Sequence, residues 1–113
     1  MGNGDVSGSY FLAMSEFLVD EEEVLDELVE HRAWSKAGYD EGIILFSGRL
    51  DPPEGGMICF RAESAEAAAA FIASDPFAVS GVAKYTLIKF TPTTFPWRSK
   101  AFAAFDAMDR VAG

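Results

Sequence analysis

The sequence has 113 residues, half of them hydrophobic, which is enough for one domain with a core of its own. Its formal net charge of −9 at pH 7 argues against nucleic-acid binding and against anionic membrane surfaces, because like charges repel. The single cysteine, Cys59, excludes an internal disulfide and favours a cytoplasmic location.

Two further classes are disfavoured. No stretch approaches the roughly 18 consecutive apolar residues of a membrane span. With one cysteine and one histidine, a zinc site built from these ligands within a single chain is excluded, and we expect no metal.

The N-terminal half predicts a strand followed by a helix. Residues 1–9 are small and polar, and we expect them to form a flexible lead. Residues 10–17 are apolar on both parities, which predicts a strand buried on at least one face. Acidic residues at 20–23 favour the positive end of a helix dipole, and helical spacing predicts a helix to about Ala37 that stops at Gly38.

The second half predicts a hairpin, a helix and a last strand. Strands are expected at 43–47 and 57–62, joined by a turn-rich loop, and Ser64 is a good N-cap for a helix over 65–74. Residues 82–90 predict the fourth strand. The C-terminal extension, 92–113, contains prolines and then a short helix expected at 99–111.

The order β-α-β-β-α-β predicts a ferredoxin-like α+β fold, with a four-stranded antiparallel sheet and both helices on one face. Right-handed crossovers place the first and third strands in the middle. The other sheet face is then bare, although its strands are apolar there. We therefore expect a homodimer that pairs through the open sheet face.

The only histidine, His31, follows Leu28 and Val24 at helical spacing, so it lies on or beside the helix face that packs on the sheet. Asp75 follows the second helix, and both helices cover the same face, so these two side chains could meet. A carboxylate can orient an imidazole and set its tautomer, and such a pair could act as a general acid and base.

Each residue of this pair also has a structural explanation. A single histidine on a helix face is often a satisfied residue at the edge of the core. Asp75 before Pro76 is typical of a helix N-cap with proline at the first position, and Gly81 would end the short turn at 77–80. The two roles of Asp75 are compatible, because one carboxylate oxygen can cap while the other faces a histidine.

Other candidates lie at the end of the second strand. Ser47 and Gly48 could offer a hydroxyl and a close backbone approach, or could simply end the strand. Arg49 could hold a carboxylate or phenolate, or could be a solvated loop residue.

Four aromatic residues could line a pocket or belong to the core: Phe60, Phe77, Tyr85 and Trp97. No nucleotide-binding or nucleophile-elbow motif is present, so we expect no cofactor.

The sequence resembles the YciI-like (YCII-related) family over roughly residues 10–90. The resemblance is carried by "EHRAWSKAGYDEGIILFSGRL", "GGMICFRAESAEAAAAFIASDPFAVSGV" and "AKYTLIKF", in that order. It is marked by His31, Ser47-Gly48, a serine-led helix start, Asp75-Pro76-Phe77 and Gly81. One departure is Gly48-Arg49, where family members often have Gly-Pro.

The resemblance implies a YciI-like domain at 10–91 that forms a dimeric α+β barrel, with His31 and Asp75 as the active site. One type of member removes chloride from a chlorinated hydroxyquinol, and muconolactone isomerases and small monooxygenases share the barrel.

We therefore expect a cofactor-independent enzyme that transfers a proton, by elimination or isomerisation, on a small cyclic or aromatic molecule. Ser47, Gly48, Arg49 and Phe77 would bind the substrate. The alternatives are a non-catalytic dimer that binds a small molecule or a partner, and a cofactor-free oxygenase.

Overall fold

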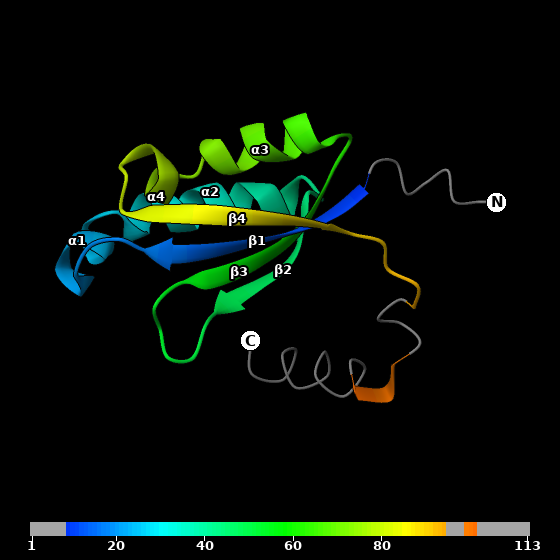
Figure 1. The fold of residues 1–113 in the computed structure, drawn as a ribbon, viewed down its shortest axis with the longest axis horizontal. Coiled ribbons are helices and arrows are strands. Elements are labelled where there is room, and N and C mark those ends of the chain that lie inside the picture. The colour runs from blue at the N-terminus through cyan, green and yellow to red at the C-terminus, as the bar shows by residue number, and fades with distance from the viewer. Residues whose placement is uncertain (1–8, 95–98, 102–113) are drawn as a thin grey trace.

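A computed structural model describes residues 9–94 and 99–101 (Figure 1). Residues 1–8 of the expected N-terminal lead at 1–9 lie outside the described residues. The same holds for residues 102–111 of the helix expected at 99–111. The elements are β1 (Ser9–Phe17), α1 (Glu21–Asp26), α2 (Leu28–Asp40), β2 (Ile44–Arg49), β3 (Gly56–Ala62), α3 (Ala65–Ala73), α4 (Pro76–Val79) and β4 (Ala83–Phe90).

The four strands form one antiparallel sheet in the order β2-β3-β1-β4. The first and third strands are therefore central, and the predicted ferredoxin-like α+β fold is confirmed. Helices α2 and α3 lie along the same side of the sheet (Figure 1). Among the described residues, no helix is both long and apolar enough to cross a membrane.

The main core lies between this helix layer and the sheet. Its ring and aliphatic side chains come from β1, β2, β3 and α3, and they include Phe11, Ala13, Ile44, Ile58, Phe60, Ala68 and Ile72. A smaller cluster at one end joins α1, α4 and the start of β4 through Val24, Phe77, Val82 and Ala83. Helix α4 is thereby held against the sheet, which matters for the site it carries.

The prediction of one helix that stops at Gly38 is wrong in two respects. The helix is broken at Glu27 into α1 and α2, and α2 continues through Gly38 to Asp40. Gly38 serves close packing, because a Cβ atom there would lie 2.6 Å from Cδ1 of Ile44 on the neighbouring strand. The residue with the left-handed backbone is Gly42, at φ +77°, just after the helix.

A bulge in β2 decides which of its side chains face the helices. Ile44 pairs with a core residue of β3, and the register then shifts by one residue at Leu45. After the shift, Ser47 pairs with another core residue, Ile58. Because residues directly opposite each other share a face, Ser47 and Arg49 lie on the helix side of the sheet.

Candidate active site

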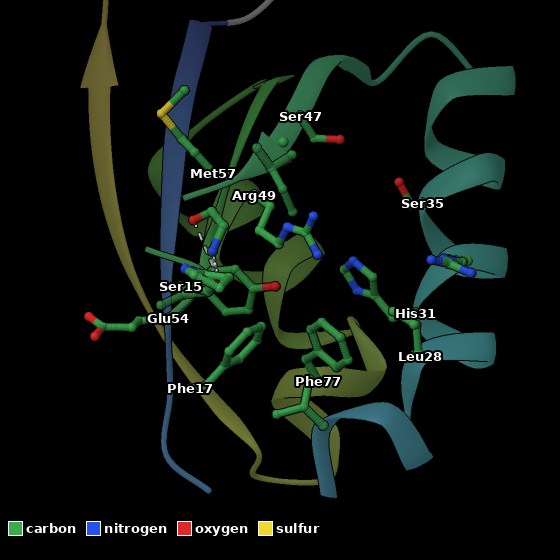
Figure 2. Close-up of a pocket in the computed structure, with 18 of the residues that line it drawn as sticks. Ser15, Phe17, Leu28, His31, Ser35, Ser47, Arg49, Glu54, Met57 and Phe77 are labelled. Atoms are coloured by element: carbon green, nitrogen blue, oxygen red, sulfur yellow. Dashed lines mark hydrogen bonds between the residues drawn. The ribbon is translucent and has the colours of Figure 1, made fainter. Parts of the chain in front are cut away.

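A cleft of about 920 Å³ opens between α2 and the helix-facing side of the sheet (Figure 2). Its walls come from all four strands, from α1, α2 and α4, and from the loop between β2 and β3. Six residues singled out from the sequence line it: His31, Ser47, Gly48, Arg49, Phe77 and Tyr85. Asp75 does not reach the cleft surface, because it is completely buried.

His31 enters the cleft from α2 with its ring held on two sides. Its Nδ1 atom lies 2.8 Å from Oδ1 of Asp75. The ring stacks on Phe77 with the centroids 4.0 Å apart and the planes 4° from parallel. The side chain is 20% exposed, so one edge of the ring remains open to solvent. The ring orientation is therefore set by a polar contact and by an aromatic surface.

Asp75 accepts hydrogen bonds on both of its carboxylate oxygens. Oδ1 accepts from the backbone N–H of Phe77 at 3.1 Å, which caps α4, and Oδ2 accepts from the hydroxyl of Tyr85. The predicted helix cap is confirmed, and the same oxygen that caps the helix also faces His31. Gly81, at φ +82°, follows α4 as expected.

This geometry determines the tautomer of His31. An ionised carboxylate can only accept hydrogen bonds, so the hydrogen between Asp75 and His31 is carried by Nδ1. In the neutral ring, Nε2 is then the nitrogen with the free lone pair. Nε2 has no hydrogen-bond partner among the residues that the structure describes. It is available to a molecule in the cleft.

Tyr85 lies beside Asp75 as a permanent donor. Burial raises the pKa of its hydroxyl well above the ordinary value, and the hydrogen bond to Asp75 and the charge of that carboxylate raise it further, whereas a hydrogen bond with Ser15 lowers it. Ser15 is itself fixed, since its Oγ accepts from the backbone N–H of Gly56 at 2.8 Å. The hydroxyl of Tyr85 thus stays protonated and keeps Asp75 satisfied.

The contact between α2 and the end of α3 is reinforced next to this pair. Trp34 packs over the ring of His31, and its indole N–H donates to Oγ of Ser74 at 2.9 Å. Ser74 is the residue directly before Asp75. The indole thereby ties the helix that carries His31 to the segment that carries the carboxylate.

The residues from β2 lie at the other wall of the cleft. Ser47 shares a hydrogen bond of 2.8 Å with the hydroxyl of Tyr39 on α2. A Cβ atom at Gly48 would meet nothing within 4 Å, so the packing around this glycine does not require it. Arg49 is exposed, and its guanidinium points into the cavity on the side of His31 (Figure 2).

Sequence reasoning missed the partnership of Tyr85 with Asp75, although it named Tyr85 as a possible pocket aromatic. Strand parity was the available signal. Tyr85 is two residues before Leu87, so the two side chains share a sheet face, and Leu87 packs on the core. Phe60 was a wrong pocket candidate, because it is fully buried in the main core. Trp97 lies outside the described residues.

Metal ligands are not gathered in this cleft. Within residues 9–94 and 99–101, no group of three or more histidine, cysteine, aspartate or glutamate side chains is placed to hold a metal ion.

The fold is shared with two solved structures. One is 5-chloro-2-hydroxyhydroquinone dehydrochlorinase (TftG) from Burkholderia phenoliruptrix AC1100, in complex with 2,5-dihydroxybenzoquinone. It has a TM-score of 0.63 and 19% identity, over 73% of this chain and 93% of that chain. The other is a protein of the antibiotic biosynthesis monooxygenase type from Bacteriodes thetaiotaomicron VPI-5482, with a TM-score of 0.50 and 16% identity over 76% and 91% of the chains.

At these identities the likeness concerns the fold alone. No curated protein matches the sequence significantly. The family comparison is decisive, because the YCII-related domain matches residues 10–91, most of the chain, and the chain therefore belongs to the YCII-related family.

Proposed function

We propose that this protein is a cofactor-independent enzyme that moves a proton on a small cyclic or aromatic molecule, by elimination or isomerisation. The observation that carries the proposal is the orientation of His31. Its Nδ1 is bound to a buried carboxylate, while Nε2 is left to an open cleft. A base fixed in this way needs no reorganisation before it accepts a proton.

The step follows from that orientation. Nε2 of His31 takes a proton from a carbon or oxygen of the substrate, and the released electron pair forms a new double bond. In an elimination a leaving group departs with its bonding electrons. In an isomerisation the imidazolium returns the proton to another atom of the ring. Asp75 stabilises the imidazolium, because its charge lies 2.8 Å from Nδ1.

The cleft suits a flat molecule. Phe77 offers a ring beside His31, and Phe17 and Leu28 add apolar surface. Ser47 and Gly48 could position a substrate oxygen from β2. The structurally similar dehydrochlorinase was solved with a hydroxylated quinone, which supports the choice of hydroxylated rings as first candidates.

We further propose that the enzyme works as a homodimer in the cytoplasm. As far as the structure describes the chain, helices α1–α4 leave one face of the sheet uncovered, and that face exposes Met14 (37%), Phe46 (50%) and Ile88 (45%). A second copy would remove this apolar surface from water. The cytoplasmic location rests on the single cysteine, because proteins of oxidising compartments commonly use disulfides. Burial raises the pKa of the thiol of Cys59, which favours its reduced, protonated form.

The test is turnover of a ring panel in D₂O. Chlorinated hydroxyquinols, their chlorine-free counterparts and unsaturated lactones are incubated with the wild type, His31→Gln and the surface control Lys36→Met. NMR follows deuterium uptake and double-bond migration, and an electrode follows chloride.

We expect the wild type and Lys36→Met to turn over at least one compound, and His31→Gln to be slower by about 100-fold or more. A wild type that binds rings but exchanges no proton would instead identify a binding module. Turnover that survives His31→Gln would contradict the role of the histidine.

A further inference from the structure

We propose that the cleft selects a ring that carries an oxyanion, a carboxylate or an ionised ring hydroxyl, and that Arg49 binds this group. The inference rests on the proposed function and adds the charge of the substrate to it. It is carried by the position of Arg49, by the absence of an ion-pair partner for its guanidinium within the described part of the chain, and by its relation to His31.

The bulge at Leu45 is what brings Arg49 into the cleft. Without it, the alternation along β2 from Ile44 would turn Arg49 to the open face of the sheet, and the register shift reverses this. The residue opposite Arg49 on β3 is Gly56, which puts no side chain beside it. The long arginine stem therefore has room to extend over the sheet toward α2.

The guanidinium has no carboxylate partner within residues 9–94 and 99–101. The ion pairs there join His31 to Asp75, Lys36 to Asp40 and Lys84 to Glu16. This is notable in a chain with 18 acidic and 9 basic residues, where acidic partners are abundant.

Two acidic residues, Glu21 and Glu54, are among those that line the same cleft. Neither forms an ion pair with Arg49, and the side chain of Glu54 points away from the cavity (Figure 2). Among the residues that the structure describes, nothing neutralises the positive charge of Arg49, which is left for a ligand.

Arg49 and His31 point into the same cavity from opposite walls (Figure 2). A guanidinium can hold a carboxylate or phenolate with two parallel hydrogen bonds, which fixes the plane of the bound group. A ring anchored in this way would present its far edge to Nε2 of His31 and its face to Phe77. The negative charge that proton removal leaves on the ring would also lie near the guanidinium.

The test measures binding with matched anionic and neutral rings. Benzoate is compared with benzamide, and 2,5-dihydroxybenzoquinone, ionised at neutral pH, with the neutral 2,5-dimethoxybenzoquinone. The readout is the NMR shift of the ring signals of His31, which are unambiguous because there is one histidine. The proteins are the wild type, Arg49→Met and Lys36→Met, which removes one positive charge from the exposed surface of α2.

We expect the wild type and Lys36→Met to bind the anionic member of at least one pair more tightly than the neutral member. Arg49→Met should bind that anion about tenfold or more weakly than the wild type does, with the binding of the neutral compound unchanged. An effect in the benzoate pair would identify the bound group as a carboxylate, and an effect in the quinone pair would identify it as an ionised ring hydroxyl.

Equal binding of both members, or a preference that Arg49→Met retains, would overturn this inference and leave the proposed function standing. If none of the four compounds moves the signals of His31, the ring-binding cleft of the proposed function fails as well.

Discussion

Replacing Asp75 with alanine should destabilise the fold strongly, because this carboxylate is completely buried and satisfies several donors. The substitution leaves the N–H of Phe77 and the hydroxyl of Tyr85 without an acceptor. Each buried donor left unpaired costs about 1–3 kcal/mol. The bond from the N–H of Phe77 is also the helix cap of α4, so the loss of the cap is not counted a second time. We expect the free energy of unfolding to fall by about 3–5 kcal/mol in total.

Asp75→Asn is the matched control. Its carbonyl oxygen can still cap Phe77 and accept from His31, while its amide faces the oxygen of Tyr85, so we expect a loss of about 1–2 kcal/mol. Urea unfolding followed by circular dichroism measures both variants. A loss below about 1 kcal/mol for the alanine variant, or equal losses for the two, would refute this account of the buried carboxylate.

Three further predictions concern other parts of the molecule. Because the pKa of Tyr85 in the folded state lies above the ordinary value of 10.0, its stabilising contribution is complete below about pH 10 and is lost as the pH rises further. Tyrosine absorbance of the wild type, compared with that of Tyr85→Phe, should show that Tyr85 ionises only with alkaline unfolding, and ionisation of Tyr85 in the folded protein near pH 10 would contradict this. Gly38→Ala should cost about 1–3 kcal/mol of unfolding free energy by overpacking, whereas Gly48→Ala, which meets nothing within 4 Å, should stay within about 0.5 kcal/mol; similar values in thermal or urea unfolding would be inconsistent with the packing. Light scattering should show that Ile88→Asp lowers the mass from dimer to monomer while Val79→Asp, 73% exposed on α4, does not; a monomeric wild type would remove the proposed interface.

Local signals were sufficient for most of the fold. The strand and helix order follows from periodicity and capping residues, and Ser64 and Asp75 cap α3 and α4 as predicted. Such caps are readable because the side chain bonds to a backbone N–H within three residues. The misplaced helix end at Gly38 shows the limit, since a glycine required for close packing looks in sequence like one that ends a helix.

The geometry of the candidate site depends on contacts that are distant in sequence. His31 and Asp75 are separated by 44 positions. Because both predicted helices cover one sheet face, the two side chains could meet, and the family resemblance implied that they form the active site. Their contact between Nδ1 and Oδ1 follows only from the structure. The bulge at Leu45 has no signature in the sequence, yet it decides that Ser47 and Arg49 face the cleft. Strand parity could have predicted that Tyr85 faces the helices. It could not have predicted the partner of the Tyr85 hydroxyl, because that partner depends on the position of α4 and of its N-cap Asp75.

The most direct test of the central claim is the ring-nitrogen NMR spectrum of ¹⁵N-labelled protein, recorded where His31 is neutral and then with a bound ring compound. We expect that Nδ1 carries the hydrogen, held by Asp75, and that the ligand shifts the Nε2 signal far more than the Nδ1 signal. A hydrogen on Nε2 in the neutral ring, or a ligand that leaves Nε2 unaffected, would contradict the placement of His31 as a base that faces the cleft.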